Sequence, residues 1–173
     1  MASIIPTSSF MTAEGLFSLF NQWDIRYQNF DHNPVMTCAD KINVEIPGAH
    51  TKNLFLTDGK GKYWLVSTFE NARIDLKILQ KILTVKNLRF GSADSLKESL
   101  GILPGAVSMF AIVNDWQKKV TPIIDPRLLD SDQICFHPLH NSATVVISNK
   151  DLVRFFTQLN REYKTLDLAA VAL

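Results

Sequence analysis

The feature that most restricts the fold of this chain is a pair of aromatic and aliphatic runs flanking a glycine-rich turn. The runs cover residues 53–57 and 62–67, and residues 58–61 between them include two glycines. Glycine adopts positive φ angles without strain, which the tight turns of hairpins require. This pattern predicts an antiparallel β-hairpin.

Composition sets the class of protein around that hairpin. The chain has 173 residues, of which 46% are hydrophobic, so it has enough apolar material for the core of one ordinary domain or two very small ones. That mixture excludes a disordered tail and a collagen-like fibre. The 18 Lys and Arg nearly balance the 17 Asp and Glu. A protein that coats nucleic acid by bulk charge is therefore excluded, although a local basic face is not.

The apolar runs also bear on location. The run at residues 107–113 is far shorter than the roughly 20 residues of a membrane span. Residues 1–6 carry no Lys or Arg before their short apolar patch, which is unlike a signal peptide. Two cysteines, Cys38 and Cys135, are too few for a disulfide framework. We expect a cytoplasmic protein without a membrane segment.

Helices are predicted where apolar residues recur at helical spacing behind a capping side chain. Such segments run from Thr12 to about residue 22, onward from Asp75, from Ser92 to Gly101, and over residues 149–159. The pattern places Ile82 and Val153 on the buried faces of the second and fourth. A short helix over residues 37–43 and a helical turn at Pro126 complete the set.

Strands are predicted in short runs rich in β-branched and aromatic residues. Without an internal repeat or a linker, these runs and the helices predict one mixed α+β domain. Besides the hairpin, the predicted strands cover residues 25–30, 87–90, 107–113, 120–124, 134–137 and 143–147.

Metal and nucleophile motifs are weak in this sequence. None of the four histidines pairs with a cysteine at zinc-ligand spacing, and Pro138 separates His137 from His140. There is no GxSxG elbow, no P-loop and no GxGxxG. Cys135 and His137 are two apart in a predicted strand, so a cysteine hydrolase is possible, although a buried cysteine is more often a small hydrophobic residue. We expect no metal and no cofactor.

Three other stretches place polar groups or glycines where a ligand can bind. Lys52 and Asn53 begin the hairpin, residues 101–107 hold two glycines, and residues 136–141 put histidines on a stiff loop. Each also has an explanation without a ligand. Lys52 fits a solvated surface lysine, Gly101 fits a helix cap, and His137 fits a half-buried, hydrogen-bonded ring.

Together and in this order, these stretches resemble the aminoacyl-tRNA deacylases, and more narrowly the free-standing relatives of the prolyl-tRNA synthetase editing domain. The resemblance implies a single domain with a mixed, mostly antiparallel sheet or partial barrel surrounded by helices. It places the domain at residues 12–160, between a loose N-terminal segment, 1–11, and a C-terminal tail, 161–173. The matching residues are 51–56, 58–65, 88–90, 100–107, 113–115 and 136–141.

The resemblance implies hydrolysis of the ester that joins a wrong amino acid to tRNA. In the branch with the most similar pattern, the substrate is alanine on the tRNA for proline, tRNA(Pro). A synthetase pocket built for proline rejects a smaller side chain by only about 1–3 kcal/mol, so a second, hydrolytic site supplies the missing discrimination. The alternatives are a deacylase for cysteine or another small amino acid, and a non-catalytic module that binds tRNA or a synthetase.

The resemblance also implies roles for individual residues. Lys52 holds the terminal phosphate or steadies charge on the ester, Asn53 orients the substrate, and His137 limits the pocket. The substrate's own ribose hydroxyl helps to activate water, and no metal or cofactor is implied. Many relatives carry Thr-Pro after the loop valine where this chain has Ser108-Met109, which leaves the amino acid open. The remaining predicted substrate-binding residues are Gly101, Pro104, Gly105, Ala106, Val107, Ser108 and Asn141.

Because the net charge is close to zero, tRNA binding needs a local basic patch or help from prolyl-tRNA synthetase. Each candidate side chain also fits an ordinary solvated surface charge. The predicted tRNA-binding residues are Lys60, Lys62, Lys118 and Lys119, with Lys86 and Arg89 as further candidates.

Overall fold

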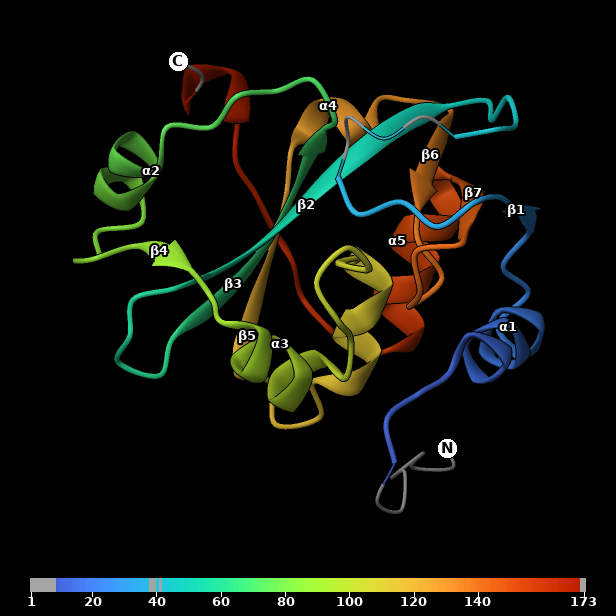
Figure 1. Cartoon of the computed structure of the whole chain (residues 1–173), viewed down its shortest axis with the longest axis horizontal. Helices are drawn as coiled ribbons and strands as arrows, with labels where there is room; N and C mark the ends of the chain where they lie inside the picture. The colour runs from blue at the N-terminus through green and yellow to red at the C-terminus, as the bar shows by residue number, and fades with distance from the viewer. Residues whose placement is uncertain (1–8, 38–39, 41, 172–173) are drawn as a thin grey trace.

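A computed structural model describes residues 9–37, 40 and 42–171 of the chain. Its centre is an eight-stranded sheet with strand order β1-β7-β6-β2-β3-β5-β8, and β4 pairs with β2 off this path (Figure 1). The strands are β1 (Tyr27–Asp31), β2 (Ala49–Thr57), β3 (Tyr63–Phe69), β4 (Arg89–Phe90), β5 (Val120–Ile124), β6 (Gln133–Phe136), β7 (Ala143–Ser148) and β8 (Lys164–Thr165). The helices are α1 (Ala13–Gln22), α2 (Leu76–Ile82), α3 (Ala93–Leu100), α4 (Pro126–Leu129) and α5 (Asn149–Gln158), with 3₁₀ helices η1 (Met109–Asn114) and η2 (Leu168–Val171).

The sheet is mixed, which confirms the predicted α+β class. The pairs β1–β7, β6–β7, β2–β3 and β2–β4 are antiparallel, while β2–β6, β3–β5 and β5–β8 are parallel. The sheet is open, with β1 and β8 at its edges, and does not close into a barrel in the described part of the chain.

The predicted hairpin is β2 and β3, in register from Thr51 opposite Phe69 to Thr57 opposite Tyr63. Its turn is held by Asp58, whose Oδ1 accepts hydrogen bonds from the backbone N–H groups of Lys60 (2.8 Å) and Lys62 (3.3 Å). Gly59 has φ +72°, and a Cβ built on it lies 2.4 Å from Nη2 of Arg89. The Arg89 guanidinium therefore lies directly on the turn, in space that only glycine leaves open.

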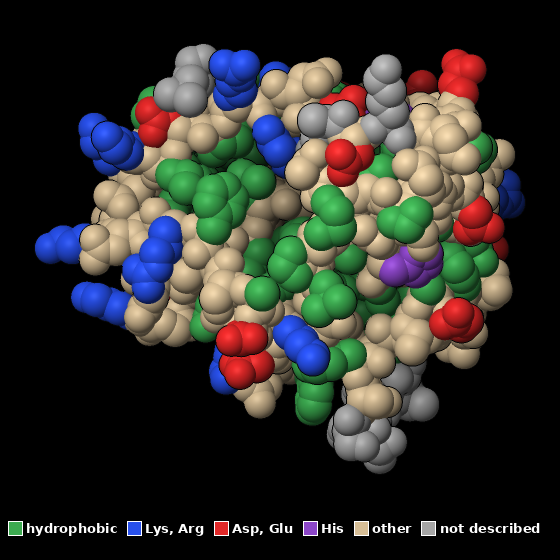
Figure 2. Space-filling model, viewed as in Figure 1, with side chains coloured by type: hydrophobic (Ala, Val, Ile, Leu, Met, Phe, Trp, Pro, Cys, Tyr) green, Lys and Arg blue, Asp and Glu red, His purple; other side chains and the backbone are tan. Residues whose placement is uncertain are grey.

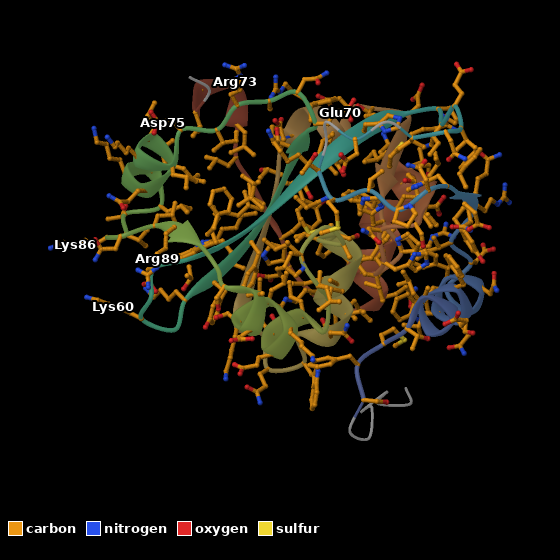
Figure 3. The ribbon with its side chains drawn as sticks, in the orientation of Figure 1. Lys60, Glu70, Arg73, Asp75, Lys86 and Arg89 are labelled. Atoms are coloured by element: carbon orange, nitrogen blue, oxygen red, sulfur yellow. The ribbon has the colours of Figure 1, made fainter. Side chains whose placement is uncertain are left out.

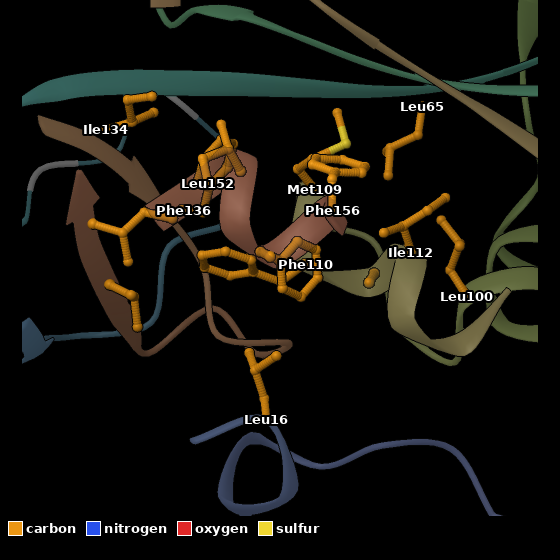
Figure 4. Packing of buried hydrophobic residues seen from close by; sticks show 14 of the residues in the cluster. Leu16, Leu65, Leu100, Met109, Phe110, Ile112, Ile134, Phe136, Leu152 and Phe156 are labelled. Carbon is orange, nitrogen blue, oxygen red and sulfur yellow. The ribbon is translucent and has the colours of Figure 1, made fainter. Parts of the chain in front are cut away.

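The two faces of the sheet bury separate cores. The larger core lies between the sheet and α1, α3, η1 and α5, and Phe110 at its centre makes edge-to-face contacts with Phe20, Phe136 and Phe155 (Figure 4). The smaller core lies under α2 and η2 and includes Trp64. Side chains alternate between the faces of a strand, so neighbouring residues of β3 serve different cores.

The predicted helices are confirmed where a cap marks their start. The side chains of Thr12, Asp75 and Ser92 each accept a hydrogen bond from a backbone N–H of the first turn of α1, α2 and α3. Ile82 and Val153 are corrections, because they are 44% and 43% exposed. Both lie on the outer sides of their helices, where the apolar stripe is wider than the contact with the sheet.

The strand predicted over residues 107–113 is wrong, because Met109–Asn114 forms the 3₁₀ helix η1. Ser108 caps it by accepting a hydrogen bond from the N–H of Phe110 (3.2 Å). An apolar run that is buried on all sides has the same sequence pattern in a strand and in a helix. Only the capping residue distinguishes the two conformations. The helix predicted over 37–43 is also absent from the described residues of that range; Cys38, Ala39 and Lys41 lie outside them.

The two chain ends predicted to lie outside the domain make contacts with it. In the predicted tail 161–173, β8 pairs with β5, and Arg161 forms a buried ion pair with Asp115. Residues 1–8 of the predicted N-terminal segment lie outside the described residues, whereas the backbone N–H of Met11 donates to Oδ1 of Asn114 (2.7 Å).

Candidate active site

A cavity of about 190 Å³ opens where β2 changes partners. Ala49 and His50 pair with β6, and from Thr51 onward β2 pairs with β3. At this point residues of β2, β6 and β7, Glu70 just after β3 and the neighbouring loops surround one space. The lining residues are Val35, Met36, Thr37, Asp40, Ile42, His50, Thr51, Lys52, Asn53, Glu70, Gly105, Val107, Cys135, Phe136, His137 and Thr144.

A chain of polar groups fixes Asn53 at the cavity wall. The hydroxyl of Ser67 donates to Oδ1 of Asn53, and Nδ2 of Asn53 donates to Oγ1 of Thr51 (3.2 Å). The hydroxyl of Thr51 in turn donates to the carbonyl of Cys135 (2.7 Å), which ties β3, β2 and β6 together. An amide nitrogen has two N–H donors, so one remains for a ligand after the bond to Thr51.

Lys52 follows Thr51 on β2 and lines the same cavity as Asn53. It lies opposite Thr68, and its ammonium donates to the carbonyl oxygen of Ala72, just beyond the end of β3. Glu70 lines the same cavity, so the wall carries both signs of charge (Figure 3 labels Glu70). Because the partner of the ammonium is a neutral carbonyl, the positive charge is not cancelled by a carboxylate bonded to it.

His137 lines the cavity as a neutral ring. Burial lowers its pKa, and this effect outweighs the hydrogen bond to the carbonyl of Ala143, which acts in the opposite direction. Nδ1 lies 2.8 Å from that carbonyl oxygen, so Nδ1 carries the proton and Nε2 is an acceptor. His32, whose ring centroid lies 6.1 Å away, packs against the ring and is held by the hydroxyl of Thr144.

The glycine loop reaches the cavity through Gly105 and Val107. Gly105 has φ +88°, and a Cβ built on it lies 3.1 Å from Sδ of Met36. Asn141 donates from Nδ2 to the carbonyl of Val35 (2.7 Å), beside Met36. The segment with Val35 and Met36 forms one wall of the cavity. Gly105 lets Met36 approach closely, and Asn141 holds Val35 by a hydrogen bond.

The other predicted substrate-binding residues do not line the cavity. Gly101 ends α3 in a left-handed conformation, Pro104 is exposed, and Ala106 is buried in the larger core. Ser108 is buried as the cap of η1. The sequence prediction missed Met36, Asp40, His50 and Glu70 at the cavity; of these, only His50, two residues before Lys52 in the same strand, carried a usable signal.

Cys135 is not an available nucleophile. Burial raises the pKa of its thiol to about 12, and Sγ donates to the carbonyl of Pro47 (3.1 Å). A thiol in that state is protonated at neutral pH and therefore unreactive. This weighs against the hypothesis of a cysteine hydrolase with His137.

The predicted tRNA-binding lysines lie on exposed surface away from the cavity. In Figure 2, Lys and Arg side chains gather at the left of the view, where Figure 3 labels Lys60, Lys86 and Arg89 around the hairpin tip. Lys118 and Lys119 are exposed in the loop before β5, and the ammonium of Lys118 donates to the carbonyl of Asn160 (3.1 Å).

The part of the chain that the structure describes offers neither a cluster of metal ligands nor a membrane-spanning helix. No group of three or more His, Cys, Asp or Glu side chains there is placed to hold a metal ion. None of the described helices has the length and apolar character needed to cross a membrane.

Comparison with known families decides the relationship. The model of the aminoacyl-tRNA editing domain matches residues 32–155, which include the hairpin and every described wall of the cavity. This chain belongs to the aminoacyl-tRNA editing domain family. The family predicted from the sequence is thereby confirmed.

Relatives of known name support the same grouping. The prolyl-tRNA editing protein ProX of Acetoanaerobium sticklandii is 34% identical over 158 residues, covering 90% of this chain and 96% of that protein. The prolyl-tRNA synthetase associated domain-containing protein 1 of Bos taurus is 34% identical over 138 residues, covering 76% of this chain and 80% of that protein.

Solved structures share the fold of this editing domain. A crystal structure described as a candidate trans-editing enzyme for prolyl tRNA synthetase superposes with a TM-score of 0.65 at 17% identity and covers 96% of this chain and 98% of that one. The hypothetical protein APE2540 superposes with a TM-score of 0.67 at 15% identity, covering 88% and 97%. At these identities the likeness concerns the fold alone.

Proposed function

We propose that this protein is a hydrolase that removes a wrongly attached amino acid from tRNA, acting in trans as a free-standing editing deacylase. The observation that carries the proposal is the meeting of Lys52, Asn53, Gly105 and His137 around one cavity in a chain of the editing-domain family. The names of the relatives, which include a prolyl-tRNA editing protein, point to the same activity.

The size of the cavity fits an aminoacyl group. A cavity of about 150 Å³ in another protein takes up one benzene molecule. The space here, about 190 Å³, accommodates an amino acid of similar size but not the ribose and base to which it is esterified. The terminal adenosine therefore stays at the mouth, and the ester bond lies near the wall that carries Lys52 and Asn53.

The chemistry assigned to these residues is electrostatic. Water attacks the ester carbonyl, negative charge develops on its oxygen, and the remaining N–H of Asn53 donates to that oxygen. The ammonium of Lys52 stabilises the same charge or a terminal phosphate of the tRNA. The bond between the acyl carbon and the ribose oxygen then breaks, the ribose oxygen takes up the proton lost by the water, and the amino acid leaves as its carboxylate. His137, neutral with Nε2 as an acceptor, borders the amino acid and limits its size. In this proposal the hydroxyl of the substrate's terminal ribose helps to activate the water.

The substrate we assign is alanine on tRNA(Pro), in the cytoplasm, where a prolyl-tRNA synthetase is a possible partner. A synthetase pocket for proline cannot reject alanine by more than a few kcal/mol, which creates the need for such an enzyme. Lys52, the glycine loop and His137 occur together at one cavity. This combination supports a catalytic site and weighs against a module that only binds tRNA.

The test is hydrolysis by the purified protein of alanyl-tRNA(Pro), with prolyl-, cysteinyl- and seryl-tRNA as parallel substrates. The expected result is rapid loss of alanine while proline is spared. Survival of every ester, both with and without added prolyl-tRNA synthetase, contradicts the proposal.

A second measurement tests the role of His137. His137→Ala removes a side chain that lines the cavity, so on this proposal the preference among alanine, serine and cysteine should become weaker. An unchanged ranking of the three esters removes His137 from the selection of the amino acid.

A further inference from the structure

A second hollow, which we call the lysine groove, lies at the other end of the hairpin. It measures about 530 Å³ and is bounded by the starts of β3 and β5, by β8 and by the segment after α2. Lys62, Lys119 and Lys164 stand on it from three separate parts of the chain. The lining residues are Gly61, Lys62, Tyr63, Trp64, Ile82, Leu83, Thr84, Val85, Lys119, Thr121, Ile123, Lys164, Thr165 and Leu166.

The charge of the lysine groove is of one sign. All three lysines are exposed, and the fourteen described residues that line the groove include neither Asp nor Glu. Outside the lining, Asp58 holds the hairpin turn and its charge interacts with Lys62, and Asp115 is buried against Arg161. Three exposed ammonium groups around one hollow attract a polyanion.

The floor of the lysine groove argues against a flat apolar ligand. Trp64 and Ile123 are only 7% and 1% exposed, so they offer little apolar surface to a ring. The accessible polar groups are the lysines with Thr84, Thr121 and Thr165 among them, while Ile82, 44% exposed, leaves some apolar surface beside them. Ammonium and hydroxyl groups on an open surface are the usual partners of phosphate oxygens along a nucleic-acid backbone.

The basic surface continues beyond the groove. Lys60, Lys86 and Arg89 surround the hairpin tip next to Lys62, at the left of Figure 3. The guanidinium of Arg89 lies beside the turn at Gly59. A continuous basic rim suits an extended chain of phosphates better than a single small anion.

The geometry points to the lysine groove as a docking site for the phosphate backbone of tRNA beside its acceptor end, an inference that rests on the proposed function. Tyr63 at the groove and Thr68 opposite Lys52 are five residues apart on β3, which is about 17 Å. The amino acid is carried on the unpaired 3′ end, so the cavity takes that end while the groove receives phosphates of the adjoining duplex.

The experiment compares two triple variants that remove the same charge. One is Lys62→Ala, Lys119→Ala and Lys164→Ala; the control is Arg26→Ala, Lys97→Ala and Lys150→Ala, which removes exposed cations from other surfaces. For alanyl-tRNA(Pro), the groove variant should raise KM about tenfold or more and leave kcat within about twofold. The slope of log KM against log salt should fall by about 3, one for each lost phosphate contact.

A short substrate separates docking from catalysis. The alanyl ester of a CCA trinucleotide lacks the duplex, so both variants should hydrolyse it as the wild type does. Equal KM values and salt slopes for the two triple variants on full tRNA overturn the inference. If the wild type hydrolyses no ester, the proposed function fails, and binding of uncharged tRNA(Pro), measured by fluorescence anisotropy at several salt concentrations, still tests the groove.

A free nucleotide offers the same phosphate chemistry. ATP is therefore titrated against the wild type and the groove variant. ATP binding that depends on the three lysines, together with tRNA binding that does not, assigns the groove to a small phosphorylated ligand and overturns the RNA docking site. Lysine-dependent tRNA binding that millimolar ATP does not displace supports it.

Discussion

The cavity and the lysine groove are two hollows at opposite ends of one hairpin, and they are built on different principles. The cavity is the smaller, about 190 Å³ against 530 Å³, and its polar groups are positioned by hydrogen bonds inside the protein. Asn53 is held by Ser67 and Thr51, and His137 is held by Ala143. The groove instead presents exposed ammonium groups. The hydrogen-bonded polar groups of the cavity suit the selection of a small group. The exposed ammonium groups of the lysine groove suit contact with a polyanion.

Strand β5 spans both regions and carries a buried carboxylate near each end. Asp115, before β5, pairs with Arg161 at the groove end, and Asp125, after it, pairs with Arg127 at the end that lies next to β3 and Thr68. Substitutions of Asp115 and Asp125 therefore perturb the groove end and the cavity end of β5 separately, and so test the difference between the two regions.

The largest effect is expected at the groove end. Replacement of Asp115, Asp115→Ala, leaves the guanidinium of Arg161, only 7% exposed, without its partner. Removing one member of a buried ion pair costs about 3–5 kcal/mol. Urea denaturation measures this loss. The control is Arg154→Ala, which breaks an exposed pair with Asp24 and should cost less than about 1 kcal/mol. Equal losses contradict a specific role for the buried pair.

Next comes the charge at the cavity. Lys52→Ala should lower kcat/KM for alanyl-tRNA(Pro) about 10²-fold or more, the usual effect of removing one group that stabilises developing charge. The melting temperature should change little, because Lys52 bonds only to a carbonyl at the rim. Lys97→Ala, exposed on α3, is the control and should retain turnover. Wild-type turnover by the Lys52 variant excludes this residue from catalysis.

A smaller effect separates backbone strain from the shape of the cavity. Gly105 and Gly61 both have φ +88°, but a Cβ on Gly105 lies 3.1 Å from Sδ of Met36, whereas a Cβ on Gly61 meets nothing within 4 Å. Alanine at either position should therefore cost about 1–2 kcal/mol in stability. Only Gly105→Ala should change the selection among alanyl, seryl and cysteinyl esters. A parallel change in Gly61→Ala would show that strain alone alters selection.

The smallest effect is a pH dependence at Asp125. Burial by itself raises the pKa of this carboxyl, but hydrogen bonds from Arg127 and Thr68 outweigh it and lower the pKa below the usual 3.8. The ionised form is thus favoured in the folded state, so its stabilisation is complete above the unfolded pKa and is lost as the pH falls through the folded value. The stability advantage over Asp125→Asn should shrink between about pH 5 and pH 3. A constant difference across that range contradicts the assignment.

Local signals explain what the sequence predicted well. The caps Thr12, Asp75 and Ser92 act within one turn of helix, and the turn around Gly59 acts within one hairpin, so no distant residue was needed to recognise them. The run that forms η1 has no helical or strand period, and its cap, Ser108, falls within the strand that the apolar pattern predicts. Local reasoning fails where burial on every side removes the alternation.

The site was predicted where residues lie on regular strands or where the family motif names them. Lys52, Asn53 and His137 were found in this way, and the cavity contains all three. Met36 and Asp40 reach the cavity through an irregular loop, which no sequence period marks. Lys164 was assigned to a tail because its contact, the pairing of β8 with β5, joins residues about 40 positions apart.

The pairing of the edge strands has a consequence for biosynthesis. β1 pairs with β7, so Tyr27 finds Ile147 across 120 positions, and in the pairing of β2 with β6 Ala49 finds Ile134 across 85. Contacts between residues so far apart in sequence slow folding, because a long loop must close before they stabilise anything. Thr144, a wall of the cavity, lies in β7 itself. The cavity is therefore incomplete on the growing chain until β7 has left the ribosome and paired with β6.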